Sequence, residues 1–111
     1  MSWTDTLNDA QAGMADFTAG QPATAEGFGA LHEASIAAGA LSAKTKELMA
    51  LAIGFSKHCV DSIAYHDKAS IEAGATRTEI EETVGVCMLM GGGPAYMYGV
   101  KALKAYDEFT G

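Results

Sequence analysis

The chain is short of positive charge, of cysteine and of long apolar runs, and each shortage excludes a class of protein. Its 111 residues include seven Lys and Arg against fourteen Asp and Glu, a formal net charge of −7 with neutral histidines. This charge repels phosphate backbones and anionic lipid, so we expect no nucleic-acid or membrane partner. The apolar stretch "LMALAIGF" is too short to span a bilayer, and the polar start "MSWTDTLNDA" does not resemble a signal peptide. We therefore expect a cytoplasmic protein.

Cysteine and size narrow the class further. Two cysteines, Cys59 and Cys87, are too few for the disulfide framework of a secreted domain, and we expect both to be reduced at rest. A chain of 111 residues with 49% hydrophobic content has room for one core. We therefore predict a single domain over residues 1–111.

The spacing of apolar residues predicts an all-α fold of about six helices, because no window shows the sustained alternation of a strand. A helix over residues 3–19 carries a stripe at steps of four and three, formed by Trp3, Leu7, Ala10, Met14 and Phe17. A second, shorter helix contains Phe28 and Leu31 and ends near Gly39. The remaining four helices are expected between about residues 42 and 109.

Capping signals delimit those four helices. Ser42 is a predicted N-cap for a helix whose apolar stripe is Leu48, Leu51, Ala52 and Phe55. Gly74 is a predicted C′ residue, and "TRTE" at residues 76–79 is a capping box. The stretch "GGGP" at residues 91–94 should end one helix and begin the last, which bears Tyr96, Val100 and Leu103.

The stretch "KHCVDSIAYH", residues 57–66, places reactive side chains at helical spacing. On a helical wheel, Cys59, Ile63, His66 and Ser70 fall within about 40° of one direction, with Ser62 about 60° to one side. The opposite face carries Asp61, Lys68 and Glu72, so we expect the cysteine–histidine face to be buried. A buried imidazole needs a partner, and Glu47 lies just outside the apolar stripe of the preceding helix. We therefore predict that Glu47, Cys59, Ser62 and His66 converge on one pocket, where the imidazole takes a proton from Cys59 directly or through Ser62.

Other interpretations compete with this one. A lone buried histidine is commonly structural, and a free cysteine is a common core residue, as we expect for Cys87. Cys59, His66 and Glu47 are at most three plausible metal ligands without metal-site spacing, so we expect no metal and no cofactor. His32 and His58 have no partner that the sequence identifies.

The spacing of Glu47, Cys59, position 62 and His66 resembles the E-x11-C-x-x-C-x-x-x-H pattern of the AhpD-like alkylhydroperoxidases, a group within the carboxymuconolactone decarboxylase family. The resemblance extends from about residue 44 to 109, through "KTKELMALAI", "CVDSIAYHDKASIEAGATRTEIEET" and "LMGGGPAYMYGVKAL". It implies an all-helical bundle assembled as a trimer or hexamer. It also implies a site in which two cysteines cycle between dithiol and disulfide while glutamate and histidine relay protons.

Ser62 stands where that pattern has its second cysteine, the thiol thought to attack peroxide. A hydroxyl cannot follow the thiol oxidation ladder, so the two-thiol cycle cannot run within one site. Either Cys59 works alone, or the reaction differs, or Ser62 replaces a natural cysteine in this sequence.

Three functions follow from the resemblance. The leading hypothesis is an antioxidant peroxidase or oxidoreductase in which an external thiol reduces Cys59, while Glu47, Ser62 and His66 assist its ionisation and move protons. The second is a decarboxylase-like enzyme acting on a small lactone or carboxylate, which needs an acid–base pair but no thiol cycle. The third is a non-catalytic oligomeric member of the family.

Overall fold

The structure is a computed structural model that describes residues 2–111, and every regular element in that range is a helix. The helices are α1 (Trp3–Gly20), α2 (Pro22–Ile36), α3 (Ala43–Ser56), α4 (Val60–Glu72) and α5 (Arg77–Thr110). The all-α prediction is therefore confirmed. None of these helices is long and apolar enough to cross a membrane.

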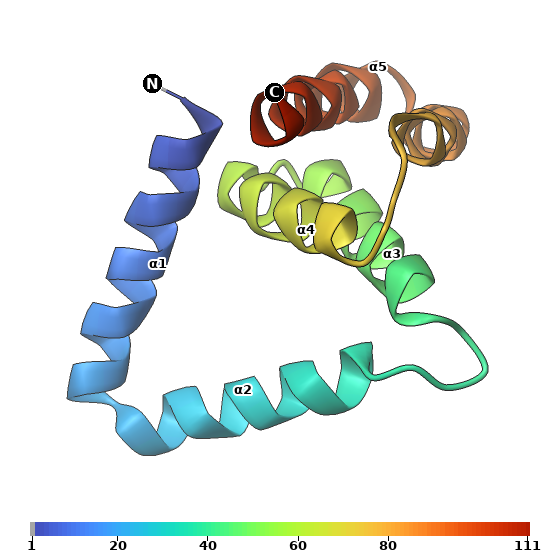
Figure 1. Cartoon of the computed structure of the whole chain (residues 1–111). Coiled ribbons are helices and arrows are strands. Elements are labelled where there is room, and N and C mark those ends of the chain that lie inside the picture. Colours follow the sequence, from blue (N-terminus) through green and yellow to red (C-terminus); the bar gives the residue numbers. More distant parts are fainter. Residues whose placement is uncertain (1) are drawn as a thin grey trace.

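Helices α3, α4 and α5 pack together, while α1 and α2 form an angled arm around one side of them (Figure 1). The arm is fixed at its start, because the backbone N–H groups of Trp3 and Thr4 donate to the Glu108 carboxylate at 2.9 and 2.8 Å. These two bonds hold the pKa of Glu108 below its usual range. The beginning of α1 therefore lies beside the end of α5.

The hydrophobic core lies between the three bundle helices. It consists of Leu51, Phe55, Ile63, Ile80, Val84 and Ala102. The predicted stripe of α3 is confirmed, since two of its members are fully buried and the other two pack against this cluster. Cys87 also packs against the core, as its apolar surroundings in the sequence predict.

The predicted caps are present. The Ser42 hydroxyl accepts a bond from the backbone N–H of Thr45, and Thr76 and Glu79 form a reciprocal capping box. Gly74 has a φ of 96°, the left-handed conformation expected just after a helix. These signals fix the ends of α3, α4 and α5.

The expected count of six helices is not confirmed, because α5 is assigned as one element. It contains a kink at Gly92, whose φ of 70° and ψ of −154° are not helical. The predicted break at "GGGP" thus falls inside α5, and Pro94 lies just beyond the kink. The second helix ends at Ile36, three residues before the expected Gly39.

Candidate active site

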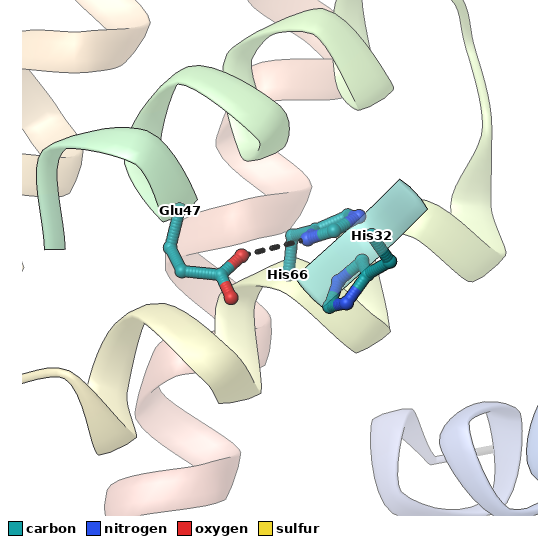
Figure 2. A group of neighbouring side chains, drawn as sticks. All are labelled: His32, Glu47 and His66. Atoms are coloured by element: carbon teal, nitrogen blue, oxygen red, sulfur yellow. Dashed lines mark hydrogen bonds and ion pairs between the residues drawn. The ribbon is translucent and has the colours of Figure 1, made fainter. Parts of the chain in front are cut away.

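A carboxylate–imidazole pair lies at the centre of the candidate site. Glu47 on α3 faces His66 on α4, with 2.9 Å between Glu47 Oε1 and His66 Nδ1 (Figure 2). Glu47 is only 6% exposed although it is an acidic residue, so this contact compensates part of its desolvation. Glu47 therefore points inward, as its position beside the α3 stripe predicts, and it holds the imidazole in one orientation.

Cys59 and Ser62 form the second part of the site at the beginning of α4. Cys59 is the N-cap, and its sulfur accepts hydrogen bonds from the Ser62 hydroxyl at 2.9 Å and the Ser62 backbone N–H at 3.4 Å. The sulfur therefore lies beside the free N–H groups of the first turn of α4. The cysteine is exposed, so a solute can reach the sulfur.

The prediction that Cys59 lies within a helix on a buried face is wrong. The chain leaves α3 through a Schellman turn, in which Cys59 N–H bonds Gly54 O and His58 N–H bonds Phe55 O. His58 takes the left-handed position of that turn, with a φ of 59°, and its ring stacks on Tyr98 at 4.4 Å between centroids. Because the turn uses residues 57–59, α4 begins only at Val60 and the thiol caps it.

The four predicted site residues converge only in part. A cavity of about 450 Å³ lies between the α1–α2 arm and α4, and both Ser62 and His66 line it. Cys59 is not among its lining residues, although its sulfur is hydrogen-bonded to Ser62, which is. Ser62 is therefore the residue that bonds to the sulfur and also lines the cavity that contains the imidazole.

His32 on α2 is a site residue that the sequence did not identify. Its ring lies 6.2 Å from that of His66, and both rings pack against Tyr65. One ligand atom from each of His32, Glu47 and His66 lies within 4.8 Å of the others. Among residues 2–111, these three, rather than a set containing Cys59, are the group placed to hold a metal ion. A histidine fifteen residues before Glu47, on a separate helix, carries no local spacing signal that reveals this contact.

The helical bundle and the Glu–His pair beside a helix-capping cysteine define a class of protein. The chain belongs to the carboxymuconolactone decarboxylase family, whose model matches residues 22–105. The predicted family is therefore confirmed.

Individual relatives agree with this assignment. A crystal structure of an apo carboxymuconolactone decarboxylase family protein from Legionella pneumophila is 38% identical, with a TM-score of 0.95 over 98% of this chain and 97% of that one. An uncharacterized protein of Cupriavidus necator is 37% identical over 81% of this chain and 80% of its own length. Uncharacterized protein 4 in the cox locus of Paracoccus denitrificans is 37% identical over 78% of both chains.

Proposed function

We propose that the protein is an AhpD-like thiol-dependent peroxidase in which Cys59 is the redox thiol. The observation that carries the proposal is the pair of hydrogen bonds from Ser62 to the exposed Cys59 sulfur at the start of α4. Hydrogen-bond donors and a helix N-terminus stabilise a thiolate, which is the nucleophilic form of cysteine. Exposure lets a peroxide approach this sulfur directly.

The proposed reaction balances with one peroxide and two external thiols. The Cys59 thiolate attacks one peroxide oxygen, so that an S–O bond forms, the O–O bond breaks and an alcohol or water leaves with a proton. The sulfenic acid then condenses with an external thiol, which releases water and leaves a mixed disulfide. A second thiol breaks that disulfide and regenerates Cys59, so the external thiols are oxidised and the peroxide is reduced.

The remaining residues move protons in this scheme. Ser62 bonds to the sulfur and lines the cavity that contains His66. In the proposed relay its hydroxyl oxygen accepts the thiol proton while its own proton passes to the imidazole. Glu47 orients His66 through the 2.9 Å contact and stabilises the imidazolium that results. His66 then returns the proton to the leaving oxygen.

Peroxide consumption with a small dithiol as reductant tests the proposal. Cys59→Ser should abolish turnover, because it removes the only proposed redox sulfur, while the matched Cys87→Ser in the core should retain it. His66→Ala should slow both turnover and the reaction of Cys59 with a thiol-selective reagent. Full peroxide turnover in Cys59→Ser would refute the assignment.

Ser62→Cys provides a gain-of-function arm of the same experiment. Ser62 Oγ lies 2.9 Å from Cys59 Sγ, and a disulfide needs about 2.05 Å, so a sulfur at position 62 is close to bonding distance. Peroxide should then produce an internal disulfide, detected by mass spectrometry, in place of the mixed disulfide, and turnover should rise. The Cys59→Ser/Ser62→Cys double variant is the control. If Ser62→Cys forms no disulfide and gains no activity, the redox mechanism fails.

A specific observation favours a decarboxylase-like second candidate. The cavity is lined by Ser62, Tyr65 and His66 but not by Cys59, an arrangement suited to acid–base chemistry on a small molecule. Glu33 and Asp61 also line it and oppose an anionic lactone or carboxylate substrate, which is why the thiol mechanism ranks first. If Cys59→Ser has no effect on any activity while His66→Ala abolishes it, this candidate takes precedence. Absence of both activities would leave a non-catalytic family member.

We also propose that the chain forms a homo-oligomer of three or six copies. The support is apolar surface that the single chain leaves exposed, including Met14 and Phe17 on α1 and Phe28 and Leu31 on α2. Surface of this kind is normally covered by a partner. Burial of these α1 and α2 side chains between copies would also cover the cavity that lies between the arm and α4.

A further inference from the structure

We propose that His32, Glu47 and His66 form a binding site for a divalent transition-metal ion such as Zn²⁺. The site uses the carboxylate–imidazole pair but adds a histidine that the peroxidase mechanism does not employ. The inference does not depend on the chemistry of Cys59.

The geometry comes from three side chains that approach one another from three helices. His32 is on α2, Glu47 on α3 and His66 on α4, and their side chains lie together in Figure 2. One ligand atom from each lies within 4.8 Å of the other two. Bonds of 2.0 to 2.2 Å in a tetrahedral zinc site place ligand atoms roughly 3.3 Å apart, so a closure of at most about 1.5 Å completes the set. Helix α2, which carries His32, has no buried residue.

His32 provides an independent indication of a ligand. Its Nε2 is buried and has no hydrogen-bond partner within residues 2–111. Leaving such a group unpaired costs about 1–3 kcal/mol, and native structures normally supply a partner. A metal ion bound at His32 Nε2 would give this nitrogen the partner that it lacks.

Charge around the site also favours a cation. The neighbouring lysines of α3 are engaged away from Glu47, since Lys44 pairs with Glu79 and Lys46 donates to the carbonyl of Ala37. The only ion pair that Glu47 makes in the described part of the chain is with His66. The adjoining cavity carries the further carboxylates of Glu33 and Asp61. A bound divalent ion would neutralise this negative field, which also draws cations inward.

The donor set selects the kind of ion. Two imidazoles and one carboxylate bind zinc in many catalytic sites and iron(II) in the facial-triad sites, whereas Mg²⁺ and Ca²⁺ prefer oxygen ligands. Three protein ligands leave a coordination position for water or a small ligand. Because the ion occupies the carboxylate and imidazole assigned to proton transfer, the metal-bound and peroxidase-active forms exclude each other.

Titration of the metal-free protein with Zn²⁺ and with Co²⁺, in the absence of peroxide, tests the proposal. We expect one ion per chain, and at least tenfold weaker binding in His32→Ala and in Glu47→Gln. His58→Asn is the matched control, because it removes an exposed histidine outside the site and asparagine tolerates the left-handed φ of 59°, and it should bind as wild type does. Bound Co²⁺ should give visible absorption typical of nitrogen and oxygen ligands without a thiolate charge-transfer band.

Four results would overturn the site. They are no binding to wild type, unchanged binding in His32→Ala, equal affinity for Mg²⁺, or loss of binding in Cys59→Ser, which would assign the ion to the thiol. Circular dichroism of His32→Ala checks that the variant is folded, and His32→Asn should weaken binding similarly while keeping a polar side chain. Metal binding is measured without turnover, so a protein that binds no metal leaves the peroxidase proposal intact. A protein that consumes no peroxide likewise leaves the metal site intact.

Discussion

Asp67, the residue after the candidate acid–base histidine, is a buried carboxyl group without a partner in the described chain. It is fully buried, and neither carboxylate oxygen has a hydrogen-bond partner within residues 2–111. Burial, with a smaller contribution from the negative charge of Asp107, raises the pKa of Asp67 from 3.8 to about 7. The fold therefore favours the protonated acid, and near neutral pH this side chain opposes folding.

We predict that Asp67→Asn removes a pH-dependent loss of stability. The raised pKa means that the folded state binds the proton more tightly than the unfolded chain does. Protonation of Asp67 therefore stabilises the folded state fully below pH 3.8, and this stabilisation is lost as the pH rises to about 7. The whole difference corresponds to about 4 kcal/mol. Urea unfolding from pH 4 to 8 should show wild type losing stability relative to the variant across that window. A constant difference between the two proteins would contradict a buried, protonated Asp67.

At the scale of elements, the close approach of α3 and α4 positions the site. Gly54 on α3 faces the start of α4, where an added Cβ would lie 2.9 Å from Ser62 Cβ. The Gly54 carbonyl also accepts the Cys59 N–H of the Schellman turn. One glycine thus allows the contact between the helices and helps fix both residues of the Cys59–Ser62 pair.

Gly54→Ala should therefore destabilise the protein and disturb the site together. The added methyl forces α4 outward, at a cost of about 1–3 kcal/mol for overpacking. The matched control is Gly85→Ala on α5, where a Cβ meets nothing within 4 Å and the change should be neutral or slightly stabilising. Thermal unfolding measures stability, and the rate of Cys59 alkylation reports the altered contact. Equal melting temperatures for the two variants would show that the helices do not need this glycine.

The sequence predicts helix ends well where a capping residue marks them. Ser42, the capping box at residues 76–79 and Gly74 each satisfy backbone groups through their own side chain or backbone freedom, so each is recognisable alone. The inward position of Glu47 also follows from the helical period. The Legionella structure and the family model support the fold predicted from the same patterns.

Contacts that depend on tertiary packing are not predictable in this way. The α3–α4 turn has His58 rather than glycine at its left-handed position, supported by stacking on Tyr98, so nothing in the sequence marks a break there. The helical period alone therefore places Cys59, wrongly, inside a helix that begins after it. His32 approaches His66 only because the fold brings α2 toward the bundle, and no local spacing marks that contact.

At the scale of the whole molecule, the arm leaves apolar surface that the bundle does not cover. Its two helices extend away from the bundle (Figure 1). A second cavity of about 820 Å³ is lined by residues of both helices, among them Met14, Phe17 and Phe28. Phe28 is 68% exposed, and on α5 Leu89 and Met90 are 82% and 81% exposed. Side chains of this size normally contribute about 1.5–3 kcal/mol each when buried, so their exposure is costly to a single chain.

Light scattering at micromolar concentration should therefore give a mass of three or six times the 11.5 kDa chain. The Leu89→Ser/Met90→Ser variant should shift this assembly toward smaller species, because it removes apolar surface without touching the core of the chain. The control is Glu82→Ser, an exposed acidic position on the same helix, which should keep the wild-type mass. If the assembly forms through these side chains, it should also weaken as the protein is diluted, since association depends on concentration. A monomeric wild type would contradict the proposed oligomer, and the exposed apolar side chains of the arm would then not be explained by contact with other copies of the chain.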